Sequence, residues 1–151
     1  MEIERKYLVD SLPDALDTYP HVEIEQGYLC TSPTLRVRRA GDAFWFTVKE
    51  KVRHTSTAIQ NREEEFTLSA DRYAHLRAKC DGRMVVKTRY RIPLQDGLTA
   101  ELDIFHGAHQ GLMLVEVEFP TLQAADAFTP PFWFGPDVSQ DPRFRNSRLA
   151  Q

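Results

Sequence analysis

Charged side chains recur with a period of two in this chain, beginning at its first residues. The segment 2–9 places Glu2, Glu4 and Lys6 at alternate positions. Successive side chains of a β-strand point to opposite faces, so these three share one face. That face could hold a divalent cation and an anion side by side. One such strand is weak evidence, because the solvated face of an ordinary strand also carries charges at every second position.

The same alternation returns along most of the chain, and it predicts eight strands. Two tight turns, at Gly41-Asp42 and Asp96-Gly97, and a looser one over 107–111 separate some of them. Eight mostly antiparallel strands with short turns favour a closed barrel, which leaves no edge exposed. The fold class is therefore mainly β (α+β), an eight-stranded antiparallel closed β-barrel with a few flanking helices. The predicted strands lie near 2–9, 22–30, 34–39, 43–51, 60–68, 84–93, 98–106 and 112–119.

Three short helices are expected around the barrel. One fits 70–79 with Ser69 as its N-cap, and a second fits 122–128 behind Thr121. A third is expected over 142–149.

Two segments fit neither pattern. The segment 130–136 is too rich in proline for a helix or a strand, and its aromatic side chains are expected to plug an open edge or end of the barrel. The segment 53–59 reads as a polar, mobile loop. Exposed aromatics at 132–134 would permit a homodimer without requiring one.

Length and composition limit the classes of protein that this chain can belong to. With 151 residues it forms one domain, expected over 1–151. No apolar run approaches the ~18 residues of a membrane helix, and the charged start predicts no signal peptide. Cys30 and Cys80 read as reduced, buried thiols of a cytoplasmic protein. A net charge of -3 argues against nucleic acid as a partner.

Each strand carries charges of nearly one sign on one face. The plain alternative is a sheet with its apolar side inward and its charges in water. Like charges two apart gain nothing from each other, however, and something must compensate them. The opposite faces are rich in Phe, Val, Ile and Leu and could pack against outer helices, so we expect the charges to line the lumen. The basic positions are Arg36, Arg38, Lys49, Lys51, Lys87, Arg89 and Arg91, and the acidic ones are Glu63, Glu65, Glu101, Asp103, Glu116 and Glu118.

A lumen with basic and acidic walls suits one kind of ligand. Arginine can grip phosphate oxygens bidentately, and lysine acts as a point charge. Clustered carboxylates suit a hard divalent ion, Mg²⁺ or Mn²⁺, which can bridge to phosphate. A metal-bound oligophosphate would satisfy both walls, whereas an apolar ligand would satisfy neither.

The ordered set of strand motifs resembles the CYTH superfamily, the triphosphate tunnel metalloenzymes. Glu2-x-Glu4-x-Lys6 is similar to the ExExK signature of that family, and the likeness continues along nearly the whole chain. The signature alone is moderately specific, and the ordered set is highly specific. The further matching segments are 26–29, 35–38, 46–49, 63–66, 87–90, 103–105, 111–118 and the closing segment 141–149.

The resemblance implies an eight-stranded tunnel and a set of site residues. Lys51 and Glu101 add charge without an assigned role, and Arg143 and Arg145 stand where some relatives carry lysine. Metal ligands would be Glu2, Glu4, Glu116 and Glu118 with Asp103 close by, and Glu63 and Glu65 would extend the acidic wall. Triphosphate would lie against Lys6, Arg36, Arg38, Lys49, Lys87 and Arg89.

The predicted reaction is metal-dependent hydrolysis of a terminal phosphoanhydride. The basic wall would offset charge on the transferring phosphoryl group. Tyr28, on the inward face of its strand with Gln26, is a candidate general base that the ammonium of Lys87 would activate. A core tyrosine with a satisfied hydroxyl is the equal alternative.

The sequence leaves several substrates open. Inorganic tripolyphosphate needs only the charged tunnel, whereas ATP or thiamine triphosphate needs an organic pocket, where Trp45 could stack a ring. A class IV-type adenylyl cyclase would release pyrophosphate and cyclic AMP instead of orthophosphate. A non-catalytic polyphosphate- or nucleotide-binding module is the non-enzyme alternative, and tight binding without turnover would identify it.

Overall fold

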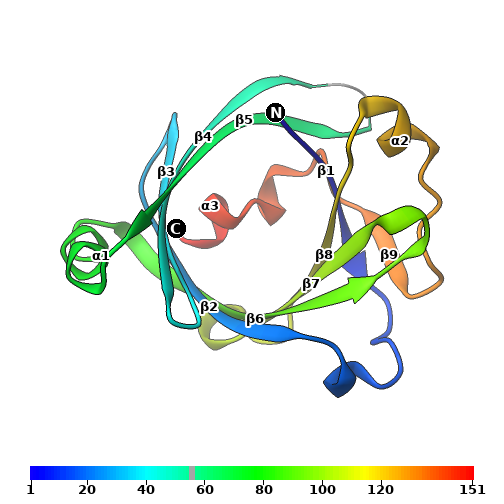
Figure 1. Cartoon of the computed structure of the whole chain (residues 1–151), viewed down its shortest axis with the longest axis horizontal. Coiled ribbons are helices and arrows are strands. Elements are labelled where there is room, and N and C mark those ends of the chain that lie inside the picture. The colour runs from blue at the N-terminus through cyan, green and yellow to red at the C-terminus, as the bar shows by residue number, and fades with distance from the viewer. Residues whose placement is uncertain (55–56) are drawn as a thin grey trace.

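The computed structural model describes residues 1–54 and 57–151, and within them a single sheet of nine strands curls into a barrel (Figure 1). The predicted fold class is confirmed, and all eight predicted strands are present with ends shifted by a few residues. The strands are β1 Glu2–Val9, β2 His21–Thr31, β3 Thr34–Ala40, β4 Ala43–His54, β5 Ile59–Leu68, β6 Asp81–Pro93, β7 Thr99–Phe105, β8 Met113–Glu118 and β9 Phe134–Asp137. The helices are α1 Ala70–Arg77, α2 Leu122–Ala127 and α3 Asn146–Leu149.

The first strand closes the barrel because it pairs with three others. The sheet order is β5-β4-β3-β2-β6-β7-β8-β1-β9, and an additional pairing joins β5 to β1. All neighbours are antiparallel, and the start of β1 pairs with β5 from Glu2 to Glu4. Along its other side β1 pairs with β8, where Glu4 lies opposite Glu118 and Lys6 lies opposite Glu116. Eight strands therefore form the ring, and β1 closes it by pairing with β5 on one edge and with β8 on the other.

The segment 130–136 contributes a strand, so the prediction that it is neither strand nor helix is wrong. Its last residues belong to β9, which pairs with β1 at Tyr7 and Val9, beyond the point where β5 leaves that edge. A strand with Pro136 is tolerated here because β9 has only one neighbour and its other edge needs no donor. Trp133 and Phe134 are buried, as expected of a plug. Phe132 is 89% exposed.

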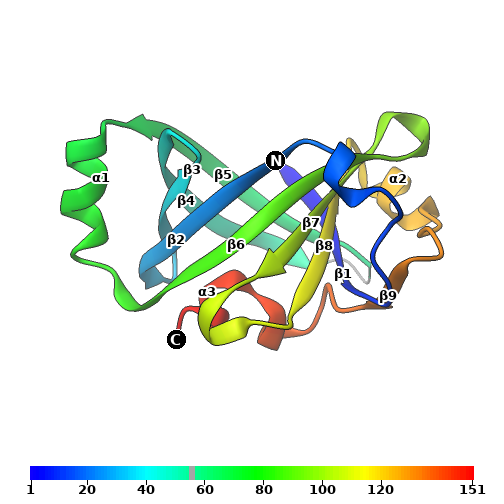
Figure 2. The same ribbon diagram turned by 90° about the horizontal axis from the view of Figure 1, so that it is seen from below.

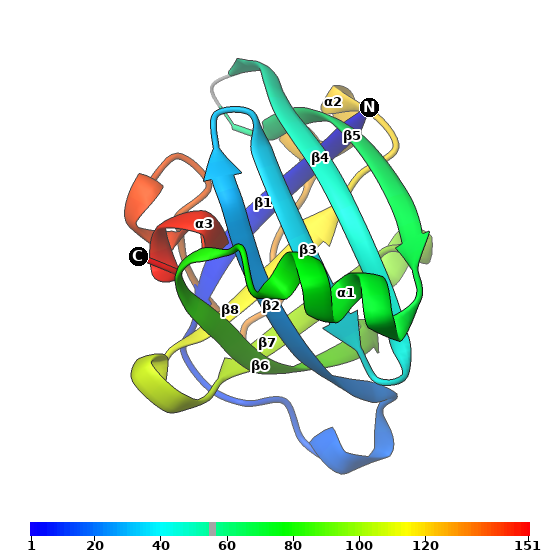
Figure 3. The ribbon, with the colours of Figure 1, turned by 90° about the vertical axis from the view of Figure 1, so that its left-hand side faces the viewer.

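Apolar side chains fill the space outside the barrel rather than inside it. The outward-facing residues of β1, β7 and β8 pack with Trp133, Phe134 and α2, and Phe134 lies 5.0 Å from Tyr7 between ring centroids. On the other side α1 packs across β3 and β4 (Figure 3), where its Tyr73 stacks near Phe44 and donates a hydrogen bond to Glu25. The predicted N-caps Ser69 and Thr121 both accept a backbone N–H. This outer packing frees the inner face for charge.

One end of the barrel is apolar and is covered by the C-terminal segment (Figures 1 and 2). Leu149 and Ala150 of this segment pack with Val85, Phe105 and Leu114, which lie two residues along their strands from Lys87, Asp103 and Glu116 and share their inward face. Hydrophobic burial therefore holds α3 across this end. The predicted helix over 142–149 is divided in two, a 3₁₀ turn at 142–144 and α3, because Arg145 between them is extended (φ -71, ψ 135).

A backbone contact anchors the chain end beside β6. The amide of Arg83 donates a hydrogen bond of 2.7 Å to the carbonyl of Ala150. Gly82 has a φ of +70, and a Cβ there would lie 2.1 Å from the same carbonyl oxygen. Only glycine fits such an approach in this conformation.

The predicted loop over 53–59 is shorter, since β4 extends to His54 and β5 begins at Ile59, and its residues 55–56 lie outside the described part. Cys30 and Cys80 are free cysteines, as predicted, but both are only partly buried, so the expectation of buried thiols is wrong. The described residues contain no helix that is long and apolar enough to cross a membrane.

An ion pair fastens β9 to the barrel and gives a first prediction. Asp137 accepts hydrogen bonds from Arg5 (2.8 Å) and from the backbone of Ser139 (2.8 Å). Burial disfavours the charged form, but these hydrogen bonds outweigh it and lower the pKa of Asp137 below 3.8. A lowered folded pKa means that the stabilisation is present above the unfolded pKa and is lost as the pH falls through the folded value.

We expect Asp137→Asn to lower the free energy of unfolding at pH 7 by about 1 kcal/mol, a modest value because the carboxylate is partly solvated. In urea unfolding the difference from wild type should shrink at about pH 2.5. Asp14→Asn, an exposed carboxylate, serves as the control. A difference that stays constant between the two pH values would contradict this account.

Candidate active site

A cavity of ≈ 1060 Å³ occupies the lumen, and every strand of the ring contributes at least one lining side chain. The alternation of the strands explains this, because the charged set of each strand points inward. All the predicted site residues line the cavity except Lys87 and Asp103, which are fully buried in its wall. The lining predicted residues are Glu2, Glu4, Lys6, Tyr28, Arg36, Arg38, Lys49, Glu63, Glu65, Arg89, Glu116 and Glu118.

The acidic wall is formed by β1 and β8. Glu4 and Glu118 are direct cross-strand neighbours, and Glu2 and Glu116 lie on the same inward faces. Burial, then the charges of Glu116 and Glu2, raises the pKa of Glu4 to about 8 despite the nearby lysines. Burial and Glu2 also raise the pKa of Glu118. These carboxylates are crowded, with too little positive charge to hold them all ionised.

Lys49 links this acidic wall to β5. Its ammonium lies 3.0 Å from Glu2 Oε1 and 3.7 Å from Glu63 Oε2. Burial would lower the pKa of Lys49, but the charges of Glu4 and Glu2 outweigh it and raise that pKa. Burial and the contact with Glu2 raise the pKa of Glu63 to about 7. One ammonium therefore serves several carboxylates at the seam between β1 and β5.

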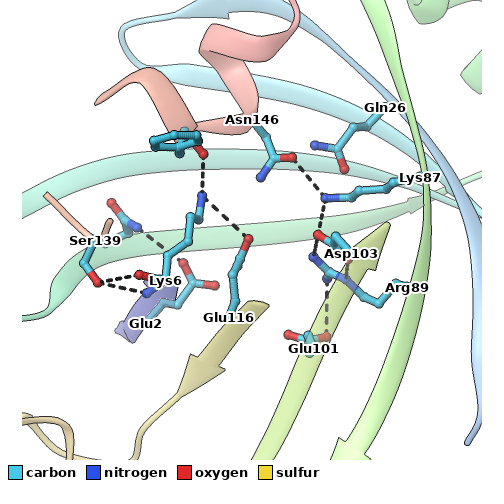
Figure 4. A network of polar contacts seen from close by, with 12 residues as sticks. Glu2, Lys6, Gln26, Lys87, Arg89, Glu101, Asp103, Glu116, Ser139 and Asn146 are labelled. Carbon is cyan, nitrogen blue, oxygen red and sulfur yellow. Dashed lines mark hydrogen bonds and ion pairs between the residues drawn. The ribbon is translucent and has the colours of Figure 1, made fainter. Parts of the chain in front are cut away.

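Lys6 stands between the acidic wall and the C-terminal segment (Figure 4). Its ammonium lies 3.7 Å from Glu116 Oε1 and donates a hydrogen bond of 3.0 Å to the carbonyl of Phe144. Its backbone N–H donates to the hydroxyl of Ser139. Burial disfavours charge on Glu116, yet Lys6 and then Arg89 hold its pKa well below the ordinary value.

Asp103 does not join the acidic wall in the structure. Both of its oxygens bind Arg89, at 2.8 and 2.9 Å, and Lys87 Nζ lies 2.8 Å from Oδ2. Burial lowers the pKa of Lys87 to about 7, because it outweighs the opposing charge of Asp103. Burial disfavours the charge of Asp103, but Arg89 and Lys87 lower its pKa. These contacts join Lys87, Arg89 and Asp103, with Arg89 at the cavity and Asp103 behind it. The resemblance instead implied a place for Asp103 close to the metal ligands.

The basic wall of β3 is incompletely neutralised. Arg36 donates to Thr47 at 3.2 Å and lies 3.8 Å from Glu65, but its buried Nε has no hydrogen-bond partner among the described residues. Arg38 donates to the oxygen of Gln26 at 3.0 Å. Burial, then the charges of Arg36 and Arg89, lowers the pKa of Arg38 to about 9, so it is still protonated at pH 7. This wall carries surplus positive charge suited to an anion.

Tyr28 is buried and lines the cavity, next to Arg36 in the β2–β3 register. Its hydroxyl accepts a hydrogen bond of 2.8 Å from Gln26 Nε2, so its own proton remains available to donate. The contacts of Lys87 among the described residues are with Asp103 and Asn146, not with Tyr28. The predicted pairing of these two residues is therefore not formed.

The donor set fits a hard divalent cation. Among the described residues, no three His, Cys, Asp or Glu side chains are already gathered at metal-binding distance. Carboxylate oxygens are nevertheless the ligands that Mg²⁺ and Mn²⁺ prefer, and crowded carboxylates with raised pKa values lack the positive charge that such an ion brings. The side chains that could hold it are Glu2, Glu4, Glu116 and Glu118.

Sequence reasoning missed polar side chains that support the charged ones. Thr47 bridges Arg36 and Glu65, and Asn61 donates to Glu2. Asn146 reaches Lys87 from the C-terminal segment. Thr47 and Asn61 lie at alternate positions with the inward charged residues of β4 and β5, so the strand pattern could have identified them. Nothing in the local pattern around Asn146 indicates that it meets β6, because 59 residues separate the two partners.

A closed eight-stranded antiparallel barrel with an acidic and a basic wall in its lumen defines a triphosphate tunnel protein of the CYTH superfamily. No family model matches the sequence. An inorganic triphosphatase of Nitrosomonas europaea is 42% identical over 153 residues, covering 99% of this chain and 96% of the relative. An inorganic triphosphatase of Acetivibrio thermocellus is 34% identical, covering 99% and 93%.

A solved structure agrees with these relatives. The crystal structure of an inorganic triphosphatase superposes with a TM-score of 0.71 at 40% identity, covering 99% of this chain and 94% of the other. The chain belongs to the inorganic triphosphatase family.

The surplus charge on β3 gives a second prediction. Arg38→Gln keeps a donor near Gln26 and removes one of the crowded cations, so the ligand-free protein should unfold at an equal or slightly higher temperature. The same variant should lose most of the rise in melting temperature that tripolyphosphate produces in wild type.

The adjacent Arg39 points to the outer face, where it donates to the carbonyl of Gly41, and provides the matched control. Arg39→Gln should retain the full response to tripolyphosphate in the same thermal unfolding experiment. Equal responses from the two variants would refute the assignment of Arg38 to the anion-binding wall.

Proposed function

We propose that this chain is a divalent-metal-dependent triphosphatase that converts inorganic tripolyphosphate to orthophosphate and pyrophosphate. The observation that carries the proposal is the meeting of crowded carboxylates and surplus cations in one closed lumen. A metal-bound triphosphate is the small molecule that neutralises both. The family membership of the chain supports the same reaction.

The basic residues would hold the substrate and offset charge on the phosphoryl group that is transferred. Arg36, Arg38 and Arg89 present guanidinium groups to the cavity, and Lys6 and Lys49 add ammonium groups beside the acidic wall. Phosphoryl transfer needs mainly positioning and charge stabilisation, which fixed cations provide without reorganisation. Water attacks the terminal phosphorus atom, the P–O anhydride bond breaks, and pyrophosphate leaves.

The carboxylates Glu2, Glu4, Glu116 and Glu118 would hold Mg²⁺ or Mn²⁺. When bound, the ion supplies charge stabilisation to phosphate oxygens and orients the phosphate chain. Tyr28 remains the candidate base, because its hydroxyl faces the cavity and is oriented by Gln26. To accept the proton of the attacking water, Tyr28 must first give up its own hydroxyl proton, so the step needs the tyrosinate form.

The inorganic substrate is favoured over nucleotides by the cavity lining. Tyr28 is the single aromatic residue that lines it within the described part of the chain, and Trp45 is not among the lining residues. An adenine or thiamine ring would therefore find no stacking partner at Trp45. Tripolyphosphate has no ring and needs only the charged side chains.

The decisive assay is phosphate release from tripolyphosphate, ATP and thiamine triphosphate with Mg²⁺, Mn²⁺ or EDTA. We expect metal-dependent release from tripolyphosphate, abolished by EDTA and lowered by roughly a hundredfold or more in Glu4→Gln. Glu64→Gln, an exposed carboxylate on the outer face of β5, should behave as wild type. Binding without release from any substrate would refute hydrolysis, and cyclic AMP from ATP would indicate a cyclase.

A separate test addresses the proton acceptor. If Tyr28 is the general base, Tyr28→Phe should lower kcat by about a hundredfold or more with little change in KM. Tyr90→Phe, on the outer face of β6 beside His21, is the matched control. Full turnover by Tyr28→Phe would remove the role and leave a tyrosine whose hydroxyl serves only to orient Gln26.

A further inference from the structure

Asn146 is a polar residue of the cavity that does not come from any strand of the barrel. It begins α3, the short helix that covers the apolar end, and its side chain lines the lumen. The strand alternation assigns it no role. Its contacts nevertheless place it within the charged network (Figure 4).

The orientation of the Asn146 amide follows from its partner. Lys87 Nζ lies 3.0 Å from Asn146 Oδ1 and 2.8 Å from Asp103 Oδ2. Lys87 Nζ donates to Asn146 Oδ1, so the amide presents its oxygen to Lys87 and turns its NH₂ group away. Figure 4 shows this nitrogen on the side of Asn146 away from Lys87, and no hydrogen bond holds it within the described residues.

The backbone around Asn146 keeps this amide in place. The carbonyl of Asn146 accepts from the N–H of Ala150, whose own carbonyl is bound by Arg83 on β6. Two residues earlier, the carbonyl of Phe144 accepts from Lys6. The C-terminal segment thus contacts lysines on two walls of the tunnel, and the free NH₂ group is a preorganised donor.

The charges nearby decide what could accept from this donor. Lys6 and Arg89 line the cavity together with Asn146, and Lys87 lies against the oxygen of its amide. Asp103 is already engaged by Lys87 and Arg89. An incoming acceptor in this environment should carry negative charge, and a phosphate oxygen fits both the donor and the cations.

We propose that Asn146 is a substrate-binding residue, whose Nδ2 donates a hydrogen bond to a phosphate oxygen of the bound oligophosphate while Oδ1 holds Lys87. This inference rests on the proposed function, because the ligand is the same triphosphate. It extends the site beyond the strands and gives the closing segment a direct part in binding.

Two substitutions separate this role from mere support of Lys87. Asn146→Ala removes both contacts. Asn146→Asp keeps an oxygen for Lys87 but loses the donor and adds a negative charge against phosphate. For tripolyphosphate binding measured by calorimetry in EDTA, we expect Kd to rise roughly tenfold in Asn146→Ala and roughly a hundredfold in Asn146→Asp. Melting temperatures should follow the opposite order, with Asn146→Asp at or above Asn146→Ala.

Opposite orders for binding and stability place residue 146 beside the bound phosphate, and the loss of affinity in the uncharged Asn146→Ala then reports the missing contact rather than charge repulsion. If Asn146→Asp binds tripolyphosphate as well as or better than Asn146→Ala, the residue only supports Lys87 and the inference is wrong. Gln95→Ala and Gln95→Glu repeat the same change of charge at an exposed turn and should leave Kd unchanged. If either raises Kd as its Asn146 counterpart does, the effect is not local to Asn146 and the inference is equally wrong.

The proposed function can fail separately. Wild-type protein that binds tripolyphosphate without releasing phosphate would refute hydrolysis, and the order of the two Kd values would still decide the role of Asn146. Wild-type protein that binds no tripolyphosphate, with or without Mg²⁺, would overturn both.

Discussion

Charge neutralisation inside a closed barrel is the constraint on which the rest of this structure depends. Burying an ion costs several kcal/mol unless an opposite charge lies against it. In the ring, Lys49 meets Glu2 and Glu63 across the seam where β5 and β1 close the barrel. Lys6 meets Glu116, and Lys87 and Arg89 share Asp103. A strand whose inward side chains all carry charge of one sign is therefore tolerated, because the fold places side chains of the opposite charge beside it or across the lumen.

This compensation is incomplete in two places, and both lie at the cavity. Arg38 is crowded by Arg36 and Arg89, and Glu4 is crowded by Glu116 and Glu2. A fold selected for stability alone would have fewer such conflicts, and local conflicts of this kind are typical of functional sites. The proposed metal and triphosphate would supply the missing charge of each sign at the same time.

The apolar residues determine the shape in which these charges meet. Because helices and β9 pack on the outer face, the inner face has no need of a hydrophobic core along most of its length. At one end the inward residues become apolar, and Leu149 and Ala150 cover them. The same segment brings Phe144 and Asn146 to the two lysines. Hydrophobic packing at the closed end thus positions polar groups of the site.

The sequence by itself determined which residues share a face, because the period of a strand is local and needs no partner. That was enough to predict the eight strands and the members of both walls except Asp103. The tertiary structure alone decided which wall residues meet. It placed Asp103 against Arg89 and Lys87, left Tyr28 with Gln26, and added β9 where β5 leaves the edge of β1. Contacts such as Lys87 with Asn146 depend on register and on closure between distant segments, which no local pattern encodes.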